Sequence, residues 1–151
     1  MARYVVGIDL GTFTEPGAGA SARVEDFAVP QLVRPGEVAP RPLLPSVVYA
    51  PLPQEFPEGS LALPWGGATK VTGEFARWQA GRVPGRVVTS AKSWLIHQGV
   101  DRQADILPWG ATSDVPRMSP VAAQAALLRH IADAWNHAHP DALLAQQEVV
   151  L

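Results

Sequence analysis

The 151-residue chain contains no cysteine. This absence excludes disulfides, thiolate zinc sites and thiol catalysis, and it fits a reducing compartment. No segment approaches the roughly 20 consecutive apolar residues that a membrane-spanning helix needs. The short apolar run after Arg3 is interrupted by Asp9 and leads to no small-residue cleavage site. We therefore expect a cytoplasmic protein with no membrane partner.

Charge is also scarce. Charged residues make up 17% of the chain, and the formal net charge is −2, which offers no electrostatic footprint for nucleic acid. Hydrophobic residues make up 47%, which excludes a wholly disordered chain and suits one domain with a core. Fifteen prolines and thirteen glycines predict much loop and extended connection.

Three segments have the composition of strands. Residues 3–10 are β-branched and mostly apolar, which predicts a central strand buried on both faces. Residues 22–33 alternate, and Pro30 favours an edge strand or a strand end. Residues 34–45 hold four prolines and predict an extended connector, followed by a short strand over 46–51.

Two short helices are expected in the middle of the chain. Residues 73–82 place apolar side chains at helical spacing, with Thr72 as a candidate N-cap. Residues 90–97 predict one or two further helical turns.

The clearest helix begins at Ser119 and Pro120, an N-cap followed by proline at the first helical position, and ends near Pro140. We expect its apolar stripe to pack on the sheet that contains residues 4–9. The stripe is Val121, Ala125, Leu128, Ala132 and Trp135. Residues 148–151 predict the start of a buried strand.

Asp9, Gly11 and Thr12 are the first candidates for chemistry. A strand that ends in Asp-Leu-Gly-Thr can place a carboxylate beside a turn whose amides form a nest for anionic oxygens. Gly11 permits close backbone approach and Thr12 adds a hydroxyl donor. Asp9 could hold the waters of a magnesium ion. A polar strand end followed by a glycine turn is the structural alternative.

The stretch VVGIDLGT (5–12) resembles the first phosphate segment of the actin-like ATPase superfamily. Within it, RPLLPSVVY (41–49) resembles the Arg-x-x-Pro-Ser-x-Val segment of the DnaK-type (heat shock protein 70) chaperones. Residues 72–97 resemble their Gly-Glu-x-Ala helix and the Ala-Lys-x-Leu stretch after it. Residues 119–135 resemble their Ser-Pro-Glu-Glu helix, and EVVL (148–151) resembles the strand that leads to Val-Pro-Ala. The order of the stretches agrees over nearly the whole chain.

The resemblance implies an α/β fold: a partial actin-like (ribonuclease H-like) ATPase domain with a mixed sheet and flanking helices. It implies that ATP or ADP binds with Mg²⁺, with Asp9 near the metal through water and Gly11 and Thr12 holding the β-phosphate. Lys92 aligns with the family's phosphate-facing lysine, which implies a catalytic and cofactor-binding role for Lys92. The alternative is that Lys92 is a solvated surface lysine. In a full-length context the resemblance also implies unfolded protein clients or co-chaperones as partners.

The sequence departs from the family pattern after Thr12. Phe13 replaces a hydroxyl-bearing residue, and Glu15 adds negative charge close to the expected phosphates. The segment 12–22 is too short for a full second strand and two turns, so we expect residues 24–29 to pair directly with residues 4–9.

The family's second phosphate loop (Asp-Leu-Gly-Gly-Gly-Thr) and adenosine segment have no counterpart in the sequence, which predicts an incomplete domain without turnover. The expected division is opening strands and phosphate loop in 1–33, a proline-rich insertion-like subdomain in 34–118, and a helix with the next strand in 119–151.

Three alternatives remain open at this stage. A sugar kinase shares the opening motif, and a degenerate, non-enzymatic domain could act as an interaction module through its proline-rich and tryptophan-rich surface. His137, His139 and Asp141 could chelate a metal if the helix has ended there, although polar residues at a fraying helix end are the simpler interpretation.

Overall fold

The computed structural model describes residues 2–10, 24–67 and 69–151, and it has both helices and strands. The helices are α1 (Glu74–Ala80), α2 (Ala91–Ile96) and α3 (Pro120–Ala138), with 3₁₀ turns η1 (Pro84–Arg86) and η2 (Leu144–Gln146). The strands are β1 (Val5–Gly7), β2 (Val29–Arg34), β3 (Glu37–Arg41), β4 (Val48–Tyr49), β5 (Val71–Thr72), β6 (Val87–Val88) and β7 (Glu148–Val150). The α/β class is confirmed, but the described strands form three small sheets where one mixed sheet was expected.

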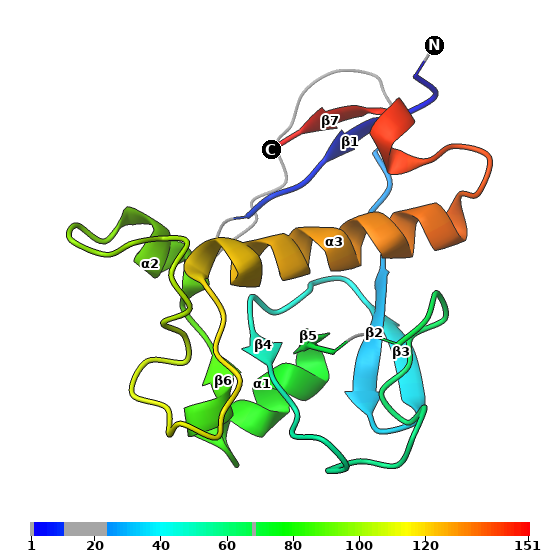
Figure 1. Ribbon diagram of the computed structural model, residues 1–151. Helices are drawn as coiled ribbons and strands as arrows, with labels where there is room; N and C mark the ends of the chain where they lie inside the picture. Colours follow the sequence, from blue (N-terminus) through cyan, green and yellow to red (C-terminus); the bar gives the residue numbers. More distant parts are fainter. Residues whose placement is uncertain (1, 11–23, 68) are drawn as a thin grey trace.

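The core is built on both faces of the antiparallel sheet β5-β4-β6, which lies between α3 and α1 (Figure 1). Because side chains alternate along a strand, neighbouring residues of β4 enter different clusters. Val48 packs with Val88 and with Leu127 of α3, whereas Tyr49 packs with Phe75 of α1. The strand expected at 46–51 is thus present, and it is the central strand of this sheet.

Strands β2 and β3 form an antiparallel hairpin, so residues 37–41 of the expected extended connector form a paired strand. The turn is Pro35-Gly36, and Gly36 has a φ of 76°, a left-handed conformation that glycine adopts without steric cost. Pro30 lies opposite Pro40 in the register. Prolines are tolerated here because they lie in a two-stranded ribbon, where each strand has an open edge.

Helix α1 begins in a different way from the one predicted. Thr72 lies in β5, and the N-cap position is Gly73, which provides no side-chain bond. The buried Gln31 side chain acts instead: its Oε1 accepts the Glu74 amide at 2.8 Å, and its Nε2 donates to the Leu43 carbonyl at 2.9 Å. A Cβ on Gly73 would lie 2.5 Å from this Oε1, so the close approach requires glycine.

Helix α3 begins as predicted, because the Ser119 hydroxyl accepts the Ala122 amide at 3.0 Å and Pro120 is the first helical residue. The predicted apolar stripe is wrong except at its last member, Trp135. Val121 and Ala125 are exposed, and Leu128 and Ala132 are only half-buried. The buried residues are Pro120, Ala123, Leu127, His130, Ala134 and Trp135. The helix is rich in alanine, so periodicity alone did not distinguish its faces.

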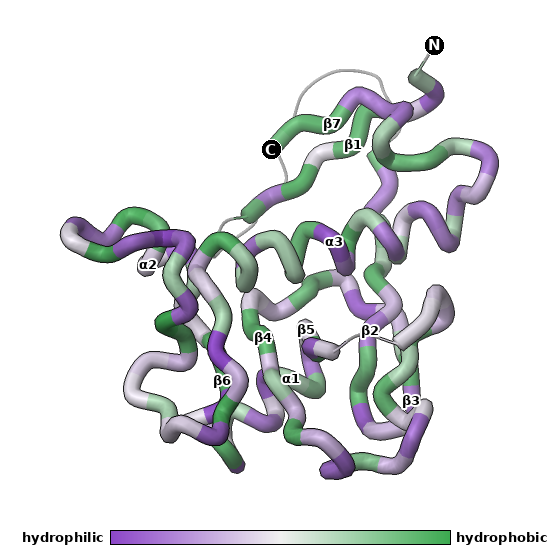
Figure 2. Tube along the Cα trace, viewed as in Figure 1, coloured by the Kyte–Doolittle hydropathy of each residue, from purple (hydrophilic) through white to green (hydrophobic). Residues whose placement is uncertain are grey.

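Strands β1 and β7 form a parallel pair on the other side of α3 from the central sheet (Figure 1), in the register Val5 to Glu148. The described partner of residues 4–9 is therefore β7, and the expected pairing with residues 24–29 is wrong. Both strands are largely apolar (Figure 2), yet Val5 is 69% and Val150 54% exposed. The expectation of buried strands is also wrong, because two strands alone cannot cover each other's faces.

An aromatic cluster attaches the β1–β7 pair to α3. The rings of Tyr4 and Phe27 lie 5.4 and 5.5 Å from that of Trp135, and His139 stacks on the same indole at 4.1 Å. The indole nitrogen donates to the Ala142 carbonyl at 2.9 Å. Trp135 thus fixes the start of β1 and the segment before β7 together.

Within the described residues, no helix is long and apolar enough to cross a membrane.

The buried face of α3 can be tested with two substitutions on one helix. Leu127 is 4% exposed and Val121 45%. We expect Leu127→Ala to lower the free energy of unfolding by about 2–5 kcal/mol, as for a core leucine. Val121→Ala should change it by less than about 1 kcal/mol. Chemical denaturation measures both; a larger loss for Val121→Ala than for Leu127→Ala would contradict the described packing.

Candidate functional site

The carboxyl end of β1 and the first turn of α2 meet in the folded chain. The Lys92 ammonium donates a hydrogen bond to the Leu10 carbonyl, with an Nζ–O distance of 3.1 Å. Leu10 directly follows Asp9 and directly precedes Gly11. The fold therefore brings Lys92 to the backbone of residues 5–12, the stretch that resembles a phosphate segment.

Strand β1 is held by hydrogen bonds to β7 and to Gln147, the residue before β7. The Ile8 amide donates to the Val150 carbonyl at 2.8 Å, one residue beyond the β1–β7 ladder. At the other end, the Gln147 Oε1 accepts the amides of Arg3 and Tyr4 at 2.9 and 3.0 Å. These contacts set the direction in which Asp9 and Leu10 leave the strand.

Lys92 is placed by the residue before it. Ala91 is 4% exposed and belongs to the core cluster that contains Leu127 and Val88. Since Ala91 holds the first turn of α2 against the core, its neighbour Lys92 projects outward and is exposed. The Lys92 ammonium has three N–H donors on a flexible stem, and one of them bonds to the Leu10 carbonyl.

The other predicted site residues divide into two groups. Asp9 is exposed and lies just beyond the end of β1, as expected for a carboxylate at a strand's carboxyl end. Gly11 and Thr12 lie outside the described residues, as does Glu15. The described part of the site is therefore the exposed Asp9 carboxylate and the Lys92 ammonium, which is bonded to the carbonyl of the next residue, Leu10. A carboxylate can hold a hydrated divalent cation, and an ammonium can hold a phosphate oxygen.

The polar helix end does not form a metal centre. Among the described residues, no group of three or more His, Asp or Glu side chains could hold a metal ion. His139 is stacked on Trp135, and the ring of His137 lies 5.9 Å from that of Trp65. Each of these two histidines thus lies against an aromatic side chain.

His130 has a structural role that the sequence reasoning missed. Its Nε2 lies 2.8 Å from the Pro30 carbonyl and its Nδ1 lies 2.7 Å from the Thr72 hydroxyl. Because a carbonyl can only accept, Nε2 carries the proton and Nδ1 accepts from Thr72. Burial lowers the pKa of His130, although the Pro30 bond and Asp133 oppose this effect. The sequence signal that could have indicated its burial is its helical spacing, which places it in one row with Ala123, Leu127 and Ala134.

A second polar network, in which only Tyr49 is fully buried, joins β4 to the long segment after it. The Tyr49 hydroxyl donates to the Glu55 carboxylate at 2.6 Å, and both oxygens of that carboxylate accept from the Arg86 guanidinium at 2.6 and 2.9 Å. Burial and the neighbouring Glu55 raise the pKa of Tyr49 to about 12. Burial opposes ionisation of Glu55, but the bonds from Arg86 and Tyr49 outweigh it and lower the pKa of Glu55.

This network does not provide a catalytic base at neutral pH. Tyr49 stays protonated, and the Glu55 carboxylate already accepts from Tyr49, Arg86 and the Leu52 amide. It fixes residues 52–55 to the central sheet. The sequence indicated a proline-rich insertion-like subdomain for these residues and did not predict the network.

Comparisons with family models, with curated proteins and with solved structures give no match to the chain. Function is therefore inferred from the motifs of the sequence and from the contact between Lys92 and Leu10.

The buried His130 makes stability depend on pH. Its lowered pKa means that the unfolded chain, with a pKa near 6.5, binds the proton more readily than the folded one. The contribution of His130 is therefore complete above about pH 6.5 and decreases as the pH falls below that value. Denaturation at pH 7.5 and pH 5.5 should show a smaller acid-induced loss in His130→Gln than in the wild type. The exposed His97→Gln should behave like the wild type; an unchanged loss in His130→Gln would contradict the assignment.

Proposed function

We propose that this chain is a nucleotide-binding portion of an actin-like ATPase domain of the DnaK chaperone type. The observation that supports the proposal is the bond from Lys92 to the Leu10 carbonyl. Two segments that resemble the family's phosphate-contacting segments, and that lie 82 positions apart, are adjacent in the fold.

Each of the candidate site residues would make a different contact with a magnesium nucleotide. Lys92 supplies a mobile positive charge beside the Leu10 carbonyl, from which it could reach the terminal phosphate oxygens. Asp9 can hold waters of the magnesium ion, since Mg²⁺ usually keeps several of its waters in protein sites. Gly11 and Thr12 would supply a backbone amide and a hydroxyl to the β-phosphate.

We expect binding to be weak and the chain alone to have no turnover. Phosphoryl transfer requires charged groups on both sides of the γ-phosphate, and the sequence has no second Gly-Gly-Gly-Thr loop. Glu15 follows Thr12 by three residues in the sequence and adds a negative charge to the expected phosphate segment. Two like charges about 4 Å apart repel by about 1–4 kcal/mol at a dielectric constant between those of water and the protein surface.

The two rival functions give different results in solution. A sugar kinase would transfer phosphate to a sugar, and a purely interacting module would bind no nucleotide. The exposed tryptophans Trp78 and Trp109, at 56% and 69% exposure, are the observation that favours an interacting surface. A sugar phosphorylation assay and a nucleotide titration separate the three functions.

Calorimetric titration with Mg-ADP and Mg-ATP tests the proposal. We expect Lys92→Ala to weaken binding by about 1 kcal/mol or more, because a point charge near the phosphates is lost. Lys70→Ala is the matched control, since Lys70 is the other lysine of the chain, and it should leave the affinity unchanged. Equal affinities of the wild type and Lys92→Ala would contradict the proposal. Phosphate release that Lys92→Ala abolishes would contradict the expected lack of turnover.

A further inference from the structure

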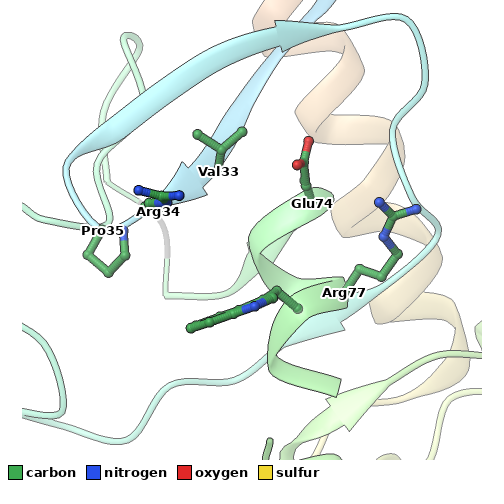
Figure 3. A pocket seen from close by; sticks show the side chains of 6 residues that line it. Val33, Arg34, Pro35, Glu74 and Arg77 are labelled. Atoms are coloured by element: carbon green, nitrogen blue, oxygen red, sulfur yellow. The ribbon is translucent and has the colours of Figure 1, made fainter. Parts of the chain in front are cut away.

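A groove of about 540 Å³ lies between the β2–β3 hairpin and helix α1. Val33, Arg34 and Pro35 line it from the hairpin, and Glu74, Arg77 and Trp78 line it from the helix. Figure 3 shows Arg34 and Pro35 on the hairpin and Glu74 and Arg77 on α1, with the Arg77 side chain extending away from Arg34. Its volume lies within the range of small-ligand and peptide side-chain pockets.

The groove is positively charged, although the whole chain has a net charge of −2. Arg34 and Arg77 are exposed, and within the described part of the chain neither forms an ion pair. The one carboxylate of the groove, Glu74, is paired with Arg41 at 2.7 Å. Two guanidinium groups are therefore available, and a guanidinium matches the geometry of a carboxylate with two parallel bonds.

An exposed but ordered indole provides the apolar part of the groove. Trp78 is 56% exposed, and its ring stacks with that of Phe75 at 6.1 Å. The Arg82 guanidinium lies 4.4 Å from the centre of the same ring, which fixes the indole and adds a third positive charge. Tryptophan and arginine are the residues most often found at the energetic centre of protein interfaces.

We infer that this groove binds an acidic peptide segment that carries an apolar side chain. Carboxylates of the peptide pair with Arg34 and Arg77, and the apolar side chain packs on Trp78 beside Val33 and Pro35. The charge of the groove selects acidic segments over basic ones, and the indole selects segments with an apolar side chain over purely acidic ones.

This surface is independent of the proposed nucleotide site. The hairpin turn and α1 lie on one side of α3, and β1 lies on the other (Figure 1). The residues that line the groove include neither Asp9 nor Lys92. Loss of nucleotide binding therefore would not remove the peptide site, and the two proposals fail separately.

A fluorescein-labelled decapeptide that alternates Asp or Glu with Phe or Leu is the probe, and fluorescence anisotropy is the measurement. We expect Arg34→Gln/Arg77→Gln to weaken binding at least about tenfold, because charge-assisted hydrogen bonds are lost. Trp78→Ala should weaken it several-fold. Arg129→Gln, an exposed arginine of α3, is the matched control and should stay within about twofold of the wild type.

Two further ligands make the result specific. The same peptide with Asn and Gln in place of Asp and Glu should bind at least about tenfold more weakly. A single-stranded oligonucleotide of equal charge is the competing ligand, because its bases could stack on Trp78, and the inference expects it to bind more weakly than the acidic peptide. Equal binding by the uncharged peptide or the oligonucleotide, or unchanged affinity in the arginine variant with an unchanged circular dichroism spectrum, would overturn the inference.

Discussion

Burial of helix α3 against the central sheet is the constraint on which the rest of the structure depends. One row of the helix, Ala123, Leu127, His130 and Ala134, is buried, and His130 bonds to both Thr72 of β5 and Pro30 of β2. The helix therefore fixes the sheet and the hairpin relative to each other. Its Trp135 then contacts Tyr4 and Phe27, so the β1–β7 pair is attached to the same helix.

The candidate site follows from this arrangement. The first turn of α2 is held in the core shared with α3 by Ala91, and β1 is held by Tyr4 and by β7. Lys92 and Leu10 meet because both are attached to one helix. Under the proposed function, the Lys92 ammonium beside this strand end would attract a phosphate, whereas phosphoryl transfer would also require charged groups on the opposite side of the phosphate.

The sequence was most informative where local chemistry decides the structure. Ser119 and Pro120 mark the start of α3 with a cap that any helix would use. It was least informative where distant contacts decide. The pairing of β1 with β7, the hairpin containing Pro30 and Pro40, and the buried face of an alanine-rich helix are all set by tertiary packing. For the site, resemblance indicated Lys92, but only the fold shows its distance from Leu10.

The central claim is that the Lys92 ammonium contacts the phosphates of a bound nucleotide. The chain has two lysines, Lys70 and Lys92, so acylation by an amine-reactive ester can be followed at each of them by mass spectrometry. The account predicts that saturating Mg-ADP slows the labelling of Lys92 and leaves that of Lys70 unchanged. Equal labelling rates of Lys92 with and without the nucleotide would contradict it.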